Sequence, residues 1–201
     1  MLLKFGANKI TFSKNSIVFR EGEKALFYWQ VAEGIVKMIN YNDKGKAFIQ
    51  GVFEKKESFG EPPLFIDLPY PSSAIAEEDT VVWKLSKESF FQLLRENFDL
   101  HLKLTKVLSQ RLHYKATLLK EISSQSPIHR LITLIDYLKK EAPNKERFYR
   151  VPYTRKELAE MTGLRVETVI RNIKKLEKMG CLTIKNRKIY RKTVNSREIP
   201  T

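Results

Sequence analysis

Sulfur ligands are scarce in this chain of 201 residues, which has a single cysteine, Cys181. One thiol excludes a disulfide framework within the chain, and it also excludes iron–sulfur and zinc sites built from several cysteines. We interpret Cys181 as a small apolar packing residue. No cofactor and no bound metal are expected from the sequence.

Long apolar runs are also absent. No window approaches the ~20 apolar residues that a membrane-spanning helix needs, and residues 1–6 are too short an apolar stretch for a signal peptide. Internal repeats and low-complexity tracts are missing, whereas hydrophobic residues make up 42% of the chain, enough for a folded core. We therefore expect a folded cytoplasmic protein that does not bind membranes.

Positive charge is plentiful but unevenly distributed. Residues 1–125 carry 18 Lys+Arg against 15 Asp+Glu, whereas residues 126–201 carry 19 against 8, within a formal net charge of +14. A nearly neutral segment followed by a strongly basic one predicts that only the second meets a polyanion. A generally solvated basic surface is the alternative that charge alone leaves open.

Residues 9–85 predict short strands separated by Gly and Asn/Asp turns. The β-rich runs are Ile17–Arg20, Leu26–Val31, Ile35–Tyr41, Ala47–Phe53 and Thr80–Leu85. Short strands at this spacing are typical of an antiparallel sandwich or barrel.

The pattern becomes helical near Ser86. A short amphipathic helix is predicted from Ser86 to Leu94, and a long one from about Phe98 to Ile122. The apolar stripe of the long helix contains Leu104, Leu108, Leu112, Ala116, Leu119 and Ile122, widened by Leu100, Val107 and Leu118. A stripe this broad can cover the barrel on one side and a second copy of the helix on the other. We predict a homodimer; a single buried helix in a monomer is the alternative.

Ser126-Pro127 restarts the chain, because serine is a good N-cap and proline is favoured at the first helical position. The new helix runs to about Glu141 and is ended by Ala142-Pro143-Asn144, and the tail from Asn195 is expected to fray. The predicted division is a barrel at 1–97, a long helix and hinge at 98–125, and a third part at 126–201.

The segment after Tyr153 predicts a helix–turn–helix. Thr154-Arg-Lys-Glu157 fits a capping box that starts a helix from Arg155 to Met161. Gly163 permits the tight turn before a second helix, Arg165–Met179. Two strands, Leu182–Lys185 and Ile189–Arg191, predict a two-stranded wing.

The second helix presents side chains that suit the DNA major groove. With Val169, Ile173 and Leu176 facing the core, the groove face holds Glu167, Thr168, Arg171 and Lys174. Arginine can form a fork of hydrogen bonds with guanine, and a carboxylate can accept one from the cytosine amino group. The alternative is an ordinary surface ion pair between Glu167 and Arg171 that has no role in DNA binding. The wing tip offers Lys185, Arg187 and Lys188 for phosphate contacts.

The order of barrel, long helix, helix–turn–helix and wing resembles the cyclic-AMP receptor protein and fumarate-nitrate reductase regulator family over nearly the whole chain. Phe59-Gly-Glu61-Pro-Pro-Leu64 is similar to the family's phosphate-binding cassette, and Val166-Glu-Thr-Val-Ile-Arg171 to its Glu-x-x-x-Arg reader. The resemblance implies an α+β fold: an N-terminal antiparallel β jelly roll, a long dimerisation helix and a C-terminal winged helix–turn–helix. It also implies a transcription regulator that binds double-stranded DNA at a palindromic site and contacts RNA polymerase.

By resemblance, Glu167 and Arg171 contact bases, and Thr154 and Arg155 contact phosphate. Val166 replaces the usual arginine, as in the oxygen-regulator branch, whose valine touches a thymine methyl. We therefore expect a half-site like TTG-x-x rather than TGTGA, with the two halves about one helical turn, roughly 34 Å, apart. Arg165 stands where the family often has Ser or Thr, and since a cation is unfavourable at a helix N-terminus, we expect it to contact phosphate or a base.

The family's cyclic-AMP pocket is incomplete here. Glu61 could bind the ribose, but Pro69-Tyr-Pro-Ser-Ser73 has no arginine for the phosphate, and the adenine positions become Lys115 and Ala116. A buried phosphate without a cation is costly, so we expect no cyclic-AMP dependence and an unknown effector or none. The candidate effector contacts are Phe59, Gly60, Glu61, Ser72, Ser73 and Lys115. A cyclic-nucleotide-responsive regulator with a non-standard pocket is the alternative.

Two other classes of protein fit the sequence less well. A barrel enzyme would gather histidines and a carboxylate around a metal, but His101, His113 and His129 all lie outside the predicted barrel. An interaction module with a decayed DNA-binding end would have lost Glu167 or Arg171, and both are present. A DNA-binding regulator, not an enzyme, is the prediction.

Overall fold

The computed structural model describes residues 1–123, 126–142 and 148–192. The chain divides into two compact units, Met1–Val107 and Leu108–Thr201. Three predicted features fall wholly or partly outside the described residues. They are the boundary before Ser126, at residues 124–125, the helix end at Pro143 and Asn144, and the tail from Asn195. The three-part division predicted from the sequence stays a prediction.

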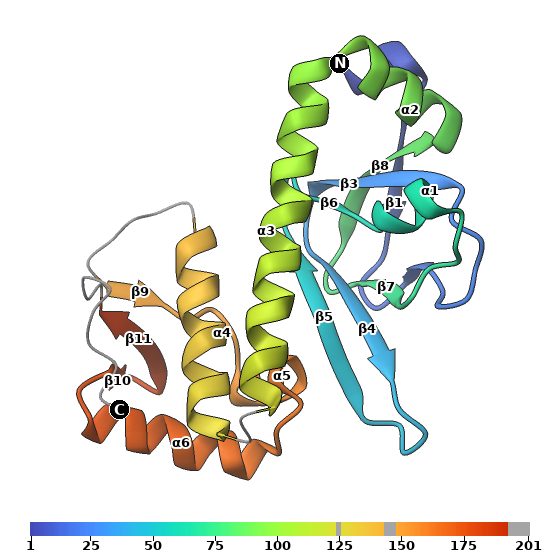
Figure 1. Ribbon diagram of the computed structural model, residues 1–201. Helices are drawn as coiled ribbons and strands as arrows, with labels where there is room; N and C mark the ends of the chain where they lie inside the picture. Colours follow the sequence, from blue (N-terminus) through green and yellow to red (C-terminus); the bar gives the residue numbers. More distant parts are fainter. Residues whose placement is uncertain (124–125, 143–147, 193–201) are drawn as a thin grey trace. The chain divides into compact units, whose positions relative to one another are not determined.

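The first unit is built on two antiparallel sheets (Figure 1). One sheet has the order β1 (Asn8–Phe12), β8 (Thr80–Ser86), β3 (Phe27–Glu33), β6 (Ser58–Phe59). The other has the order β2 (Ile17–Phe19), β7 (Ser73–Ala76), β4 (Val36–Tyr41), β5 (Ala47–Phe53). Strands β4 and β5 form a long hairpin with a register shift at Met38 and Ile39. The jelly-roll prediction is confirmed.

Aromatic side chains fill the core of this unit. Phe19 stacks on Tyr70 with ring centroids 3.7 Å apart, and Trp29 and Phe59 each lie within 6.5 Å of Phe19. The indole N–H of Trp29 donates to the Tyr70 hydroxyl at 3.1 Å, which in turn donates to the Phe27 carbonyl at 3.1 Å. The polar atoms of the cluster are thereby satisfied, as buried groups require.

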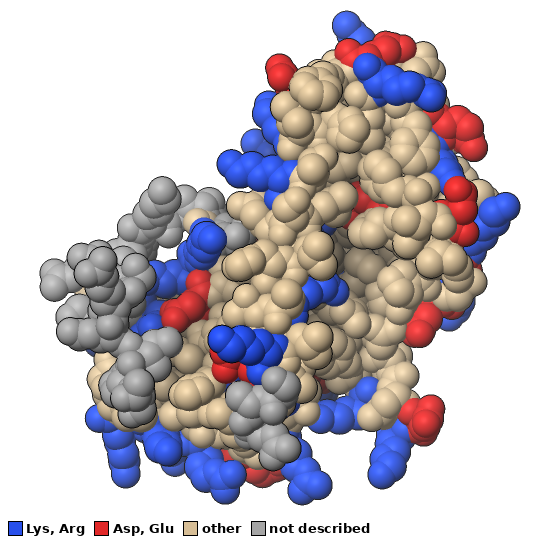
Figure 2. All heavy atoms as spheres, in the orientation of Figure 1, with Lys and Arg blue, Asp and Glu red and all other residues tan. Residues whose placement is uncertain are grey.

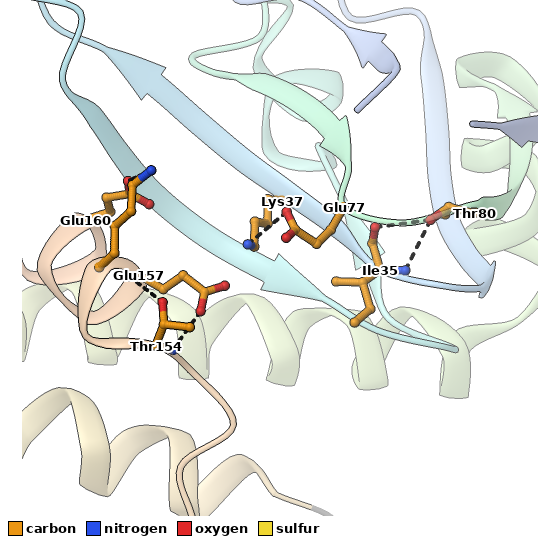
Figure 3. A network of polar contacts seen from close by, with 8 residues as sticks. Ile35, Lys37, Glu77, Thr80, Thr154, Glu157 and Glu160 are labelled. Carbon is orange, nitrogen blue, oxygen red and sulfur yellow. Dashed lines mark hydrogen bonds and ion pairs between the residues drawn. The ribbon is translucent and has the colours of Figure 1, made fainter. Parts of the chain in front are cut away.

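The turn between β3 and β4 depends on Gly34, whose φ is +86°. A Cβ at this position would lie 2.5 Å from Oγ1 of Thr80, so the turn has no room for a larger residue. That hydroxyl accepts from the Ile35 amide at 3.2 Å (Figure 3). It also donates to the Glu78 carbonyl at 2.8 Å. Nearby, the buried Lys37 pairs with Glu77 at 2.8 Å.

Short helices complete the first unit. They are a 3-10 turn at Leu2–Phe5, α1 (Pro62–Ile66) and α2 (Lys87–Glu96). Ser86 caps α2 by accepting from the Ser89 amide at 3.1 Å. Phe90 of α2 stacks on Tyr28 of β3 with centroids 4.5 Å apart, which joins the helix to the sheet.

The long helix α3 (Phe98–Ser123) starts in the first unit and ends in the second. Its broad apolar stripe has a packed side and an open side. Leu104 and Leu118 are buried, whereas Leu112 and Leu119 are 70% and 66% exposed. The sequence predicted a stripe broad enough for two surfaces, and the open side is the one left for a second copy of the helix.

The second unit contains α4 (Pro127–Glu141), α5 (Arg155–Thr162), α6 (Val166–Lys178) and a sheet of order β10-β11-β9. The strands are β9 (Phe148–Arg150), β10 (Leu182–Lys185) and β11 (Lys188–Lys192). Helix α6 packs against α4 and α5 and leads into β10 (Figure 1). Leu131, Ile135, Leu158, Ile173 and Ile189 form the fully buried centre of this unit.

Several predicted elements are confirmed to the residue, namely Ala47–Phe53, Pro127–Glu141 and Leu182–Lys185. The two-stranded wing is wrong, because β9 adds a third strand by pairing with β11, Arg150 opposite Tyr190. Strands β1, β6 and β7 were also missed. All of these are short or polar, and their pairing partners are distant in sequence.

Candidate nucleic-acid interface

A capping box fixes the start of α5, as predicted. Thr154 Oγ1 accepts from the Glu157 amide at 3.2 Å, and the Glu157 carboxylate accepts from the Thr154 amide at 2.7 Å (Figure 3). The two bonds satisfy amides that a helix N-terminus leaves without partners. Lys156 and Glu160 add an i,i+4 pair at 3.9 Å.

Gly163 makes the turn between α5 and α6 with φ +71°, in the left-handed region that glycine adopts freely. Thr162, the last residue of α5, is buried and donates its hydroxyl to the Leu158 carbonyl at 2.6 Å. The backbone carbonyl of Thr162 accepts from Nη1 of Arg130, on α4, at 3.2 Å. These contacts set the angle at which the second helix leaves the first.

Helix α6 divides sharply into two faces. Val169, Ile173 and Leu176 are buried, as predicted. Arg165 is the N-cap residue and makes no side-chain capping bond, so the helix starts one residue later than predicted. Thr168 and Val166 are half-buried at the edge of the packed face.

The exposed face of α6 carries one carboxylate and several cations. Glu167, Arg171, Lys174 and Lys178 follow spacings of four, three and four residues, which place them on one side of a helix. Figure 2 shows Lys and Arg side chains along the edge of the second unit where α6 lies. Within the described part of the chain, neither Glu167 nor Arg171 has a side-chain hydrogen bond or ion-pair partner. The alternative, a surface ion pair between Glu167 and Arg171, therefore does not form on this helix.

The wing ends in a two-residue turn with both central residues at positive φ, Asn186 at 49° and Arg187 at 62°. This is the type I′ geometry that matches the twist of a hairpin, although it is strained for arginine. Lys185, Arg187 and Lys188 are all exposed at this tip. Arg155 donates from Nη1 to the Arg187 carbonyl at 2.6 Å, so this arginine fastens the tip of the wing to α5.

The base of the wing is joined to α4 by Arg191 and Asp136. The Arg191 guanidinium makes two hydrogen bonds to the Asp136 carboxylate and a third, at 2.8 Å, to the Cys181 carbonyl. The hydrogen bond with Asp136 raises the pKa of Arg191 further above its usual range. Sequence reasoning missed this pair, although a lone aspartate inside the apolar run Leu134–Leu138 was a signal that it needed a buried partner.

The junction between α3 and α4 also escaped prediction. Tyr114 of α3 stacks on Tyr137 of α4 with centroids 3.6 Å apart, and burial raises the pKa of Tyr114. Arg130 reaches from α4 to the Ile122 carbonyl at 3.4 Å, near the C-terminus of α3. One guanidinium therefore faces the C-terminal ends of both α3 and α5, where carbonyl groups favour a cation.

The cassette residues of the first unit are closed in by aromatic rings. Phe59, Glu61 and Ser72 are at most 1% exposed. A Cβ at Gly60 would meet ring atoms of Phe19 and Tyr70 at 3.0–3.2 Å, so the rings lie directly against the cassette backbone. Ser73 accepts from the Glu21 amide at 3.0 Å. Among the described residues, the Ser72 hydroxyl is a buried polar group without a hydrogen-bond partner.

Other candidate sites add little. Lys115 lies exposed on α3, in the second compact unit. A hollow of about 260 Å³ in the first unit is lined by residues such as Lys9, Lys56 and Trp83 and includes none of the cassette residues. No group of three His, Cys, Asp or Glu side chains suited to a metal occurs among the described residues. Within the same residues, no helix combines the length and the apolar character required to cross a membrane.

Comparisons with known proteins agree with this geometry. Residues 9–97 match the cyclic nucleotide-binding domain, and residues 129–195 match the Crp-like helix-turn-helix domain. The cAMP-activated global transcriptional regulator CRP of Pasteurella multocida is 27% identical over 169 residues, covering 83% of this chain and 81% of that protein. The transcriptional activator protein anr of Pseudomonas aeruginosa is 23% identical over 180 residues, covering 88% and 73%.

Solved structures share the fold. FixK2 from Bradyrhizobium japonicum superposes with a TM-score of 0.75 at 20% identity, covering 93% of each chain. The regulator CLP of Xanthomonas campestris gives a TM-score of 0.71 at 23% identity, covering 94% of this chain and 95% of that one. The two matching domains, in this order and on this fold, identify the chain as a member of the Crp/Fnr family of DNA-binding transcription regulators, not an enzyme.

Proposed function

We propose that the protein binds a palindromic DNA site as a homodimer and that it does so without cyclic AMP. The observation that carries the proposal is the pair Glu167 and Arg171, exposed on one face of α6 and without partners in the described part of the chain. Arginine suits guanine and the carboxylate suits the cytosine amino group, so this pair fits a G·C base pair in the major groove. A half-site like TTG-x-x remains our expectation.

An open seam along α3 supports the homodimer. We define the seam as seven exposed residues whose spacing alternates between four and three: Phe98, Leu102, Thr105, Ser109, Leu112, Ala116 and Leu119. This is the a/d repeat of a two-stranded coiled coil. The small residues in the middle allow two such helices to approach closely. Two parallel copies would place the recognition helices in grooves about one helical turn, roughly 34 Å, apart.

The surface around the reading pair supports phosphate binding. Thr154, Arg165, Lys174, Lys185, Arg187 and Lys188 are exposed. Arg155 acts differently, since its guanidinium already bonds the Arg187 carbonyl and holds the wing tip. Its contribution to DNA binding is therefore to position the tip, with phosphate contact through its remaining N–H groups. We still expect such a regulator to contact RNA polymerase and to act in the cytoplasm.

The filled core of the first unit supports independence from cyclic AMP. Tyr70 is 3% exposed and stacks on Phe19 beside the cassette glycine. A nucleotide entering here would have to displace these rings, and Pro69–Ser73 offers no arginine for its phosphate. Displacing two buried aromatic rings would expose apolar area worth several kcal/mol.

The Ser72 hydroxyl favours a second candidate, a cyclic-nucleotide-responsive regulator with a non-standard pocket. This hydroxyl is buried without a partner, and an unsatisfied group of this kind costs about 1–3 kcal/mol. A ligand that displaced the rings and bonded to Ser72 would recover that free energy. Titration calorimetry with cyclic AMP separates the two candidates: the main proposal expects no binding heat.

Selection of bound duplexes from a random pool, with and without cyclic AMP, tests the DNA proposal. We expect one palindrome under both conditions. Arg171→Ala should then weaken binding to the selected site by about 1–3 kcal/mol and relax specificity at one base pair, with little change on random DNA. Lys175→Ala, on the same helix, is the matched control and should leave the base preference intact. An equal loss on both DNAs for Arg171→Ala would contradict base reading.

A further inference from the structure

An aliphatic side chain lies on the otherwise charged face of α6. Ile170 is 42% exposed, whereas its neighbours Val169 and Ile173 are at most 1% exposed. Ile170 is not among the buried core residues of the second unit. Isoleucine also forms helix less readily than alanine or lysine, so the local structure does not favour it either.

The register of the helix puts Ile170 beside the reading pair. It follows Glu167 by three residues and precedes Lys174 by four, so all three share one side of the helix. Val166, one turn earlier, is half-buried and lies on the same flank as Ile170. The face that meets DNA therefore has two adjacent rows, one polar with Glu167 and Arg171, and one apolar.

An exposed aliphatic group gains free energy only when another apolar surface covers it. In the major groove, the apolar group on a base edge is the C5 methyl of thymine, and aliphatic side chains are suited to contact it. Phosphates, sugars and the edges of guanine and cytosine offer no such methyl group.

We propose that Ile170 reads a thymine methyl in the base step next to the pair contacted by Glu167 and Arg171. This inference rests on the proposed DNA-binding function and adds a second determinant of the half-site. It is separate from the thymine contact expected of Val166, because Ile170 lies one helical turn further along α6 and is the more exposed of the two.

Replacing thymine by deoxyuridine, which differs only by the methyl group, tests the proposal. Each thymine of the selected half-site is replaced in turn, on both strands, and binding is followed by fluorescence anisotropy. At the one position that Ile170 contacts, loss of the methyl group should lower the affinity of wild-type protein about fourfold. This is the contribution of burying one methyl group. Ile170→Ala should bind the thymine and deoxyuridine sites equally at that position.

Two further duplexes and one variant sharpen the test. At the sensitive position, a 5-methylcytosine·guanine pair should bind wild-type protein better than cytosine·guanine, and Ile170→Ala should not distinguish the two. Lys175→Ala, at an exposed position of the same helix that has no assigned base contact, should keep the methyl dependence of that position, and it serves as the matched control. Ile170 is not a core residue, so Ile170→Ala should fold normally. Circular dichroism checks the helical content of each variant.

The outcomes are distinguishable. If no duplex is selected from the pool, the proposed function itself fails. If a duplex is selected but no deoxyuridine position weakens binding, or if the loss persists unchanged in Ile170→Ala, the assignment of Ile170 is wrong while base reading by Arg171 stands.

Discussion

Arg191 and Asp136 connect the wing to α4 through two parallel hydrogen bonds, Nε to Oδ1 at 2.7 Å and Nη2 to Oδ2 at 3.1 Å. The arginine side chain is nearly buried, and its remaining Nη1 group bonds the Cys181 carbonyl at 2.8 Å. Bidentate pairs of this kind fix orientation as well as distance. The direction of β11, and with it the position of the wing tip, is thereby set by α4.

Removing the arginine should therefore destabilise the second unit. We expect Arg191→Met to cost about 1–3 kcal/mol, less than a fully buried pair, because Asp136 is partly exposed and can be hydrated. Urea unfolding of the full chain, with hydrogen exchange of the β11 amides, measures the effect. Lys140→Met, on the exposed side of α4, is the matched control. Equal stability of the two variants would contradict a structural role for the pair.

Thr154 is expected to have two roles that one substitution separates. Thr154→Ala removes the cap of α5 and should cost about 1 kcal/mol. Thr154→Asp keeps a good cap and should retain stability, but it places a negative charge where a phosphate is expected and should weaken DNA binding strongly. Chemical unfolding and anisotropy on the same samples test both. Undiminished DNA binding by Thr154→Asp would remove Thr154 from the interface.

Arg187 is expected to show opposite effects on stability and binding. Its φ of 62° is strained for a side chain with a Cβ, so Arg187→Gly should stabilise the hairpin by about 1 kcal/mol. The same change removes one cation and should lower the slope of log affinity against log salt by about 0.9. Asn186→Gly changes the other positive-φ residue of the turn, where asparagine is tolerated, and keeps the cation, so its salt slope should match wild type. An unchanged slope for Arg187→Gly would place the side chain away from phosphate.

Local signals explain which elements could be predicted. The turn at Asn42–Gly45 and the Ser126-Pro127 start are short-range features, and the elements beside them, Ala47–Phe53 and Pro127–Glu141, have the predicted bounds. Strand β9 was missed because only three residues form it, and its pairing with β11 joins Phe148 to Lys192 across most of the unit. Nothing in three consecutive residues carries that information.

The site was predictable to the same extent. The exposed face of α6 follows from helical periodicity, and the same periodicity could have identified Ile170, which was overlooked beside Val169. In contrast, the packing of Phe19 on Tyr70 joins residues distant in sequence, so the filled cassette could not be foreseen. The sequence predicted independence from cyclic AMP for another reason, because Pro69–Ser73 has no arginine to neutralise the phosphate.

Tyr70 should make the first unit sensitive to alkaline pH. Burial raises the pKa of Tyr70, although its hydrogen bond with Trp29 opposes the shift. The unfolded chain loses this proton near pH 10 while the folded protein keeps it, so stability is unaffected below about pH 10 and falls as pH rises above it. Tyr70→Phe should be about 1 kcal/mol less stable at neutral pH through lost hydrogen bonds. Urea unfolding followed by tryptophan fluorescence should show this difference narrowing above pH 10, and a constant difference would contradict the assignment.

Leu112 is the most exposed leucine in the open seam of α3, and its replacement should abolish the dimer. A charge there would be buried against its own copy at the twofold axis, which costs several kcal/mol. Leu112→Asp should therefore sediment as a single subunit of 23.6 kDa. It should lose preference for the palindrome while keeping its weak affinity for a single half-site, because α6 is unchanged. Leu68→Asp, also at an exposed leucine but outside α3, is the matched control and should remain dimeric. A dimeric Leu112→Asp would move the interface elsewhere and remove the reason for the expected spacing of about one helical turn between half-sites.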